Sequence, residues 1–155
     1  MTPAILLLKK TNIQFKIHEY DHDSNRTDYG IEAASKLYLD PARVIKSLIV
    51  ELNPSGFIVA MVPISEQLSM KKLSRAAGAK QATMAPPDKI QSLTGYLAGG
   101  ISPLGQKRQL ASFLDQAAAS HNSIFISGGN RGIEIELSPH DLIDLTKAYQ
   151  TDLIA

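Results

Sequence analysis

A lysine lies inside one of the most apolar stretches of the chain. In VIKSLIV, residues 44–50, Lys46 follows Ile45 and shares its strand face with Val44 and Leu48. Its side chain could extend along its apolar stem until the ammonium reaches solvent. Alternatively, it points into a pocket, where desolvation lowers its pKa and its charge can hold an anion or a carbonyl group. A buried ammonium of this kind needs an acceptor, which we expect from the second of two glycine-rich segments.

Seven of the ten glycines lie between residues 95 and 132, in GYLAGGISPLG and ISGGNRG. A turn alone would explain a Gly-Gly pair between two strands. Two such segments favour a ligand site as well, because glycine lets the backbone approach a ligand and exposes its N–H groups. Gly99, Gly100 and Ile101 are therefore candidate backbone donors for an oxyanion, with Ser127 and Glu134 as polar contacts beside them.

Other chemistry has little support in the sequence. The chain has no cysteine, so it contains neither a thiol nucleophile nor a thiolate metal site. The loop Asp21-His22-Asp23 lacks the histidine spacing of zinc sites, and we expect no bound metal. GxSxG and GxxxxGK[ST] are absent, and GYLAGG does not fit GxGxxG, so no nucleotide cofactor is expected.

Composition restricts the class of protein. A chain of 155 residues with 44% hydrophobic and 20% charged residues indicates one globular domain, here over residues 1–155. The apolar run of residues 3–8 is too short to span a membrane and is followed by lysines, unlike a signal peptide, so a cytoplasmic location is expected. A net charge of +1 argues against a dedicated DNA-binding protein but permits a transient nucleic-acid substrate.

Caps and periodicity predict a mixed order of elements. Helices are expected at residues 3–12, 29–38, 70–77, 86–94 and 140–149, where Thr2, Ser69 and Ser138 are suitable capping residues. Strands are expected at 13–20, 44–52 and 57–64, and at 123–137 as two strands joined across GGNRG. This order predicts an α+β fold, in which helices pack outside a curved, mixed or largely antiparallel sheet of barrel-like form.

Four parts of the sequence form a series that is more specific than any one motif. They are TPAILLLKK with HEYDHD, the strand of Lys46, TGYLAGGISPLGQK and ISGGNRGIEIELSPHDL. Together they resemble the YbaK deacylases, bacterial trans-editing proteins of the YbaK/ProX superfamily, and the likeness runs nearly from end to end. The family also includes the editing domain inserted in some bacterial prolyl-tRNA synthetases, and it implies the same compact α+β domain.

The resemblance implies hydrolysis of the ester between a wrong amino acid and tRNA, chiefly cysteine on proline tRNA. Such correction is needed because a binding pocket separates small amino acids of similar size by only about 1–3 kcal/mol. The partners implied are the 3′ acceptor end of a mischarged tRNA and, in a transient complex, prolyl-tRNA synthetase. No membrane, DNA or cofactor is implied.

The resemblance also assigns roles to individual residues. Lys46 corresponds to the essential lysine of the family, Tyr20 and Ser47 to pocket residues, Gly99, Gly100 and Ile101 to the backbone donors, and Ser127 and Glu134 to the polar wall. Many relatives have threonine at Ser47 and some have aspartate at Glu134. Both differences change the room in the pocket and so bear on which small amino acid fits.

The family uses no nucleophile from the protein, which agrees with a chain that lacks cysteine and a plausible Ser-His pair. With cysteine as the misacylated residue, the resemblance implies that the substrate thiol attacks its own ester. In this mechanism we expect Lys46 and the glycine N–H groups to orient the substrate and to stabilise the oxyanion.

Three alternatives remain open at the level of sequence. Lys46 could act as a Schiff-base amine in a different enzyme. The chain could be a non-catalytic module for tRNA or a synthetase, in which Lys71, Lys72, Arg75, Lys107 and Arg108 contact phosphate groups. It could also be a deacylase for another small amino acid, such as alanine.

Overall fold

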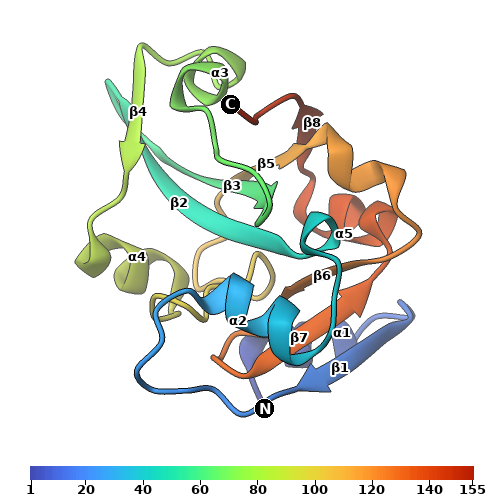
Figure 1. The fold of residues 1–155 in the computed structure, drawn as a ribbon. Coiled ribbons are helices and arrows are strands. Elements are labelled where there is room, and N and C mark those ends of the chain that lie inside the picture. Colours follow the sequence, from blue (N-terminus) through green and yellow to red (C-terminus); the bar gives the residue numbers. More distant parts are fainter.

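The computed structural model describes residues 1–155 and contains five α-helices, two short 3-10 helices and eight strands (Figure 1). The α-helices are α1 Pro3–Lys9, α2 Tyr29–Lys36, α3 Met70–Ala76, α4 Pro87–Thr94 and α5 Pro139–Thr146, and the 3-10 helices are η1 Pro41–Arg43 and η2 Gln116–Ser120. The strands are β1 Phe15–Glu19, β2 Ile45–Asn53, β3 Phe57–Pro63, β4 Gln81–Met84, β5 Ala111–Asp115, β6 Ile124–Ser127, β7 Ile133–Leu137 and β8 Tyr149–Thr151. The predicted α+β class is confirmed.

Side-chain caps begin three of the helices at the predicted places. The hydroxyl groups of Thr2, Ser69 and Ser138 each accept a hydrogen bond from the backbone N–H three residues later. A cap of this kind satisfies one of the N–H groups that a helix start leaves without a partner, and it contributes about 1 kcal/mol. None of the helices has the length and hydropathy needed to cross a lipid bilayer.

The strands form two sheets. The larger sheet is mixed and has the order β4-β2-β3-β5-β8, in which β2 and β3 form an antiparallel hairpin and β5 runs parallel to both β3 and β8. The smaller sheet is antiparallel, with the order β1-β7-β6. A single parallel bridge between Val44 and Phe125 connects the two at the start of β2. The mixed sheet is confirmed, whereas closure into a barrel is not.

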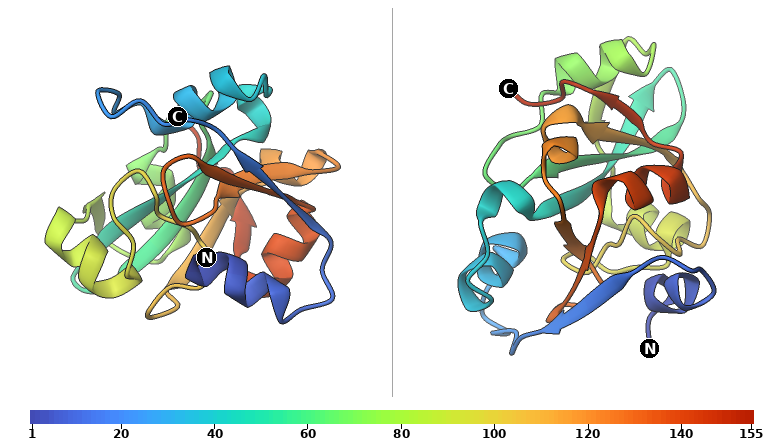
Figure 2. Two further views of the ribbon diagram at one scale, coloured as in Figure 1. Left: turned by 90° about the horizontal axis from the view of Figure 1, so that it is seen from below. Right: turned by 90° about the vertical axis from the view of Figure 1, so that its right-hand side faces the viewer.

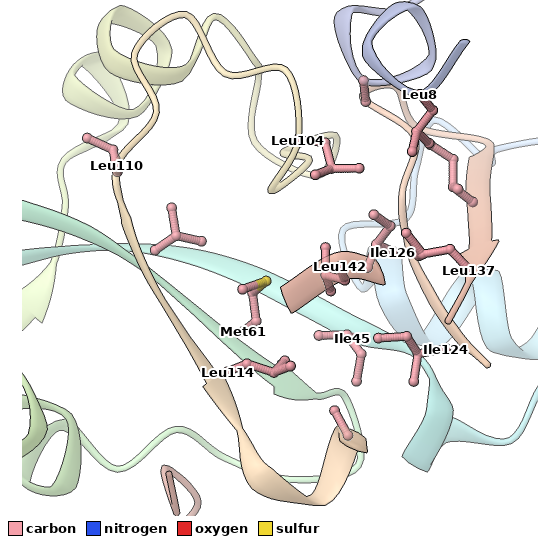
Figure 3. Packing of buried hydrophobic residues seen from close by; sticks show 14 of the residues in the cluster. Leu8, Ile45, Met61, Leu104, Leu110, Leu114, Ile124, Ile126, Leu137 and Leu142 are labelled. Atoms are coloured by element: carbon pink, nitrogen blue, oxygen red, sulfur yellow. The ribbon is translucent and has the colours of Figure 1, made fainter. Parts of the chain in front are cut away.

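The main core lies between the two sheets (Figure 3). Ile45 and Met61 of the larger sheet meet Ile124 and Leu137 of the smaller one in this cluster. Leu104, from the glycine-rich loop after α4, is also fully buried there. Burial of such a side chain stabilises the fold by about 1.5–3 kcal/mol, so this loop is anchored to the core by its own leucine.

The other face of the larger sheet carries a second apolar cluster, which α3 and the C-terminal residues cover (Figure 1). Val50 and Val62 belong to it, and the register pairs Val62 with Lys46, so Lys46 lies on this face of the sheet. Strand β4 pairs only with residues 50–53 of β2. The start of β2, which holds Lys46, is therefore left uncovered by β4.

Three strands, β4, β5 and β8, are not among those expected from the sequence. Strand β4 pairs with the end of β2, and β8 lies where the last helix was predicted to continue. Helix α5 ends at Thr146, because Lys147 takes the left-handed conformation with φ 57° and the chain then pairs with β5. Helix α1 is also shorter than predicted and ends at Lys9.

Candidate active site

A cavity of about 400 Å³ lies beside the start of β2. Its wall is built from β2, the ends of β1 and β6, strand β7, helix α2 and the glycine-rich loop. Seven of the eight site residues predicted from the sequence line it: Tyr20, Lys46, Ser47, Gly99, Ile101, Ser127 and Glu134. The eighth, Gly100, is buried and does not line the cavity. The fold thus gathers residues from positions 20 to 134 around one small space.

Lys46 reaches this cavity half-buried, and burial lowers the pKa of its ammonium below the ordinary value. The sequence predicted an acceptor for it from the second glycine-rich segment. In the structure, however, no hydrogen bond or ion pair within the protein involves the Lys46 ammonium, and Ser127 instead accepts from the Gly129 N–H at 3.2 Å. The ammonium is therefore free to bind a substrate oxygen.

Glu134 is the most deeply buried charged group of the cavity, with 6% of its surface exposed. It lies in the middle of the smaller sheet, where β7 pairs it with His18 on one side and Ser127 on the other. Its Oε2 atom has no hydrogen-bond partner. Burial raises the pKa of its carboxyl group to about 8.

Hydroxyl groups complete the polar part of the wall. The buried Oγ of Ser47 has no hydrogen-bond partner. Tyr20 is fixed through its backbone, whose N–H donates to the Gly132 carbonyl at 3.0 Å, and burial raises the pKa of its side chain. Because buried polar atoms are normally paired, the free Oγ of Ser47 and the free Oε2 of Glu134 mark a surface suited to a polar ligand.

The three predicted backbone donors differ from one another. The Gly100 N–H donates to the Leu97 carbonyl at 3.0 Å and closes a turn, so it is not available to a ligand and this part of the prediction is wrong. The N–H groups of Gly99 and Ile101 have no acceptor within the protein, and both residues line the cavity. Two donors, rather than three, can therefore face a developing oxyanion.

Arg131 fixes the orientation of the peptide between Ala98 and Gly99. Its Nε and one terminal nitrogen donate to the Ala98 carbonyl at 3.1 and 2.7 Å. In a trans peptide the carbonyl and the following N–H point in opposite directions, so holding the Ala98 carbonyl directs the Gly99 N–H away from Arg131. Arg131 does not line the cavity, whereas Ala98 and Gly99 do.

Tyr29 supports the same peptide from another side. The Arg131 guanidinium lies over its ring, 4.6 Å from the centroid. Gly99 has φ +84°, and a Cβ at this position would lie 2.6 Å from two carbons of the Tyr29 ring. Only glycine combines this backbone conformation with such a close approach.

Helix α1 holds the glycine-rich loop in place (Figure 2). A Cβ on Gly105 would lie 2.6 Å from the backbone of Pro3, so the loop is in direct contact with the start of the helix. The Thr2 hydroxyl donates to the Gly128 carbonyl, and the Tyr96 hydroxyl donates to the Leu104 carbonyl at 2.6 Å. Both glycine-rich segments are thus anchored on the first residues of the chain.

Sequence reasoning missed the roles of Tyr29 and Arg131. Arg131 lies inside the glycine-rich segment ISGGNRG, and this position is the signal that could have identified it. Tyr29 opens an ordinary amphipathic helix, and only the fold brings its ring to Gly99.

The His22 ring of the DHD loop bonds to the buried Glu32 carboxylate at 2.6 Å. No three His, Asp or Glu side chains are grouped to hold a metal ion. The chemistry available in the cavity is that of one ammonium, hydroxyl groups, two free N–H donors and two carboxyl groups. Of the two, Asp28 is paired with Arg26 at 2.8 Å, whereas Glu134 has no cation as its partner. Such a set suits a small ligand with a carbonyl group.

Comparisons with known proteins agree with this chemistry. Residues 26–145 match the family model described as "Aminoacyl-tRNA editing domain". A protein of Enterococcus faecalis named "Putative Cys-tRNA(Pro)/Cys-tRNA(Cys) deacylase EbsC" is 32% identical over 156 residues, which cover 98% of this chain and 92% of that protein. A proline--tRNA ligase of Syntrophotalea carbinolica is 31% identical over 64% of this chain, but that stretch is only 17% of the ligase.

A solved structure has the same fold. The crystal structure of "a putative trans-editing enzyme for prolyl tRNA synthetase" superposes with a TM-score of 0.81 at 25% identity, over 91% of this chain and 87% of the other. The family match spans most of the chain and includes every predicted site residue except Tyr20. The chain therefore belongs to the family of aminoacyl-tRNA editing domains.

Proposed function

We propose that the protein is an aminoacyl-tRNA deacylase that acts chiefly on Cys-tRNA(Pro). One observation carries the proposal: the unpaired Lys46 ammonium lines the same cavity as the free N–H groups of Gly99 and Ile101. Together they provide a cation and two donors for the oxygens of an ester. The name of the Enterococcus faecalis relative supports cysteine as the amino acid and proline tRNA as one carrier.

The reaction uses the substrate's own thiol. The sulfur attacks the ester carbonyl, a carbon–sulfur bond forms, and the carbonyl oxygen becomes an oxyanion that the Gly99 and Ile101 N–H groups stabilise. The bond to the ribose oxygen then breaks, the thiol proton passes to that oxygen, and a cyclic thioester is released that water hydrolyses to cysteine. Loss of one such donor typically lowers the rate by about 10²–10³.

The remaining wall residues position the substrate. Lys46 binds the acyl or ribose oxygen, and Tyr20, Ser47, Ser127 and Glu134 contact the aminoacyl group. The size of the cavity is consistent with this role of the wall residues. A cavity of about 400 Å³ accepts a small aminoacyl ester while the tRNA stays outside.

The natural partner is the 3′ acceptor end of a mischarged tRNA. Prolyl-tRNA synthetase is a second partner, in a transient complex, because similar domains form part of proline–tRNA ligases. A second candidate substrate is a tRNA that carries another small amino acid such as alanine, since Ser47 leaves more room in the wall than the threonine of many relatives.

The test is a panel of mischarged tRNAs. We expect hydrolysis of Cys-tRNA(Pro) well above that of Pro-tRNA(Pro), with Ala-tRNA(Pro) as the comparison for the second candidate. If all three esters are hydrolysed only at the rate measured in buffer alone, the deacylase proposal is refuted, and a non-catalytic binding module remains.

A further inference from the structure

The carboxyl group of Glu134 has an unusual environment for an acid. It is more than nine-tenths buried and lines the cavity, and its Oε2 has no hydrogen-bond partner. A buried carboxylate without a cation is costly, so proteins normally pair it or keep it protonated. The wall therefore contains an acceptor that nothing in the protein satisfies.

The nearby cations of the protein are not its partners. Lys46 lines the same cavity but forms no ion pair with Glu134, whose carboxyl group has none in the structure. His18, which faces Glu134 across the strands, directs its Nε2 to Glu136 at 2.9 Å. The cation that suits Glu134 must come with the ligand.

An aminoacyl ester carries one such cation, the α-ammonium. It is bonded to the α-carbon, which is directly attached to the ester carbonyl. A ligand whose carbonyl oxygen lies at Gly99 and Ile101 therefore presents its ammonium to another part of the same small cavity. We propose that Glu134 binds the α-ammonium of the substrate and that the protein consequently acts only on aminoacyl esters with a free α-amine. Esters with a blocked amine, such as N-formyl and peptidyl esters of tRNA, are spared.

The environment of the carboxyl group supports this assignment. Burial raises the pKa of Glu134 and so favours the neutral acid, and an arriving ammonium supplies the charge that permits ionisation. An amide nitrogen carries no charge and cannot replace it. The inference rests on the proposed deacylase function and narrows its substrate class.

The experiment compares two esters on the same tRNA. One is Cys-tRNA(Pro), and the other is its α-hydroxy analogue, 3-mercaptolactyl-tRNA(Pro), which keeps the thiol and the size but lacks the ammonium. Each enzymatic rate is divided by the rate of hydrolysis in buffer, because the ammonium also activates the ester. We expect the protein to prefer the amine by about 10- to 100-fold, the range of a hydrogen-bonded charge.

Variants assign that preference to one residue. Glu134→Gln should reduce the preference to about one, because the amide is similar in size but has no charge. Glu136→Gln is the matched control, since Glu136 lies on the same strand but bonds to His18 and Ser123 outside the cavity. It should keep both the activity and the preference.

The outcomes separate the two proposals. Fast hydrolysis of Cys-tRNA(Pro) with no preference over the analogue would overturn the role of Glu134 and leave the deacylase intact. The same follows if Glu134→Gln retains the preference of the unchanged protein. If neither ester is hydrolysed above the buffer rate, the deacylase proposal fails and this inference fails with it.

Discussion

Lys46 combines an apolar position in the strand with a charge that no residue of the protein pairs. Replacing it by alanine or by methionine, which keeps the stem, should abolish deacylation. The thermal midpoint should not fall, because the folded state no longer accommodates a desolvated charge. Lys46→Arg should lose most activity, since the guanidinium keeps the charge but is planar and larger.

Rates with Cys-tRNA(Pro) and thermal unfolding of the three variants check this prediction. Full activity in Lys46→Ala would mean that the lysine only extends to solvent.

Glu134 makes the stability of the protein depend on pH in a direction opposite to that of most acids. Its pKa is about 8 in the folded state and near the ordinary 4.5 in the unfolded chain. Its contribution to stability is therefore fully present below pH 4.5 and is lost as the pH rises through 8, by up to about 1.4 kcal/mol for each pH unit in this window.

The matching measurement is thermal unfolding between pH 5 and pH 9. The thermal midpoint of Glu134→Gln minus that of the unchanged protein should increase by several degrees from pH 5 to pH 9. This is the order of shift expected for a change of a few kcal/mol in the free energy of unfolding. A constant difference would show that Glu134 is ionised throughout.

At the scale of elements, the loop of Gly99 depends on its close contact with Tyr29. Gly99→Ala should remove most of the activity, because the new Cβ would collide with the Tyr29 ring and displace the backbone N–H of residue 99. Gly78→Ala is a control with φ +69° and no atom within 4 Å of the added Cβ. Both variants should lose about 1–2 kcal/mol of stability from the left-handed backbone, but only Gly99→Ala should lose activity.

Arg131 acts on the same loop from outside the cavity. Arg131→Lys should lower kcat by about 10- to 100-fold with little change in KM, because lysine cannot make the two-point contact that orients the Gly99 N–H in the transition state. Arg43→Lys is the matched control, since Arg43 also bonds to a carbonyl, that of Ser123, and lies 5.0 Å from the centroid of an aromatic ring. Equal effects of the two changes would point to a general loss of stability.

Local signals account for what could be predicted of the elements. Thr2, Ser69 and Ser138 mark helix starts because a capping hydroxyl acts within three residues. Strand β4 shows no clear alternation of apolar and polar residues, and it forms through its pairing with β2. The end of α5 is set by Lys147 in the left-handed conformation that glycine usually adopts. Long-range pairing of this kind leaves little trace in a local pattern.

The same distinction holds for the site. Residue type and the series of motifs pointed to Lys46, Glu134 and the glycine loop. Two other features of the site can be seen only in the folded structure, where the loops come together. The Gly100 N–H closes a turn, and Arg131 holds the Ala98 carbonyl.

For the molecule as a whole, we expect deacylation to be independent of added metal. No group of three ligands is present, and the His22 ring is already bonded to Glu32. Activity should therefore survive dialysis against a chelator and remain unchanged when Zn²⁺ or Mg²⁺ is returned. Recovery that needs metal would show that the reaction uses a site that the chain does not display.

The contact of helix α1 with the two glycine-rich segments has a consequence for synthesis. Thr2 meets Gly128 across 126 positions, so α1 leaves the ribosome long before its partners do. Loops of that length close slowly and late, and the exposed apolar face of α1 must wait for them. A nascent chain that has not yet released residue 128 therefore holds Lys46 without the loops that complete its cavity, and the site forms only after both glycine-rich segments have left the ribosome.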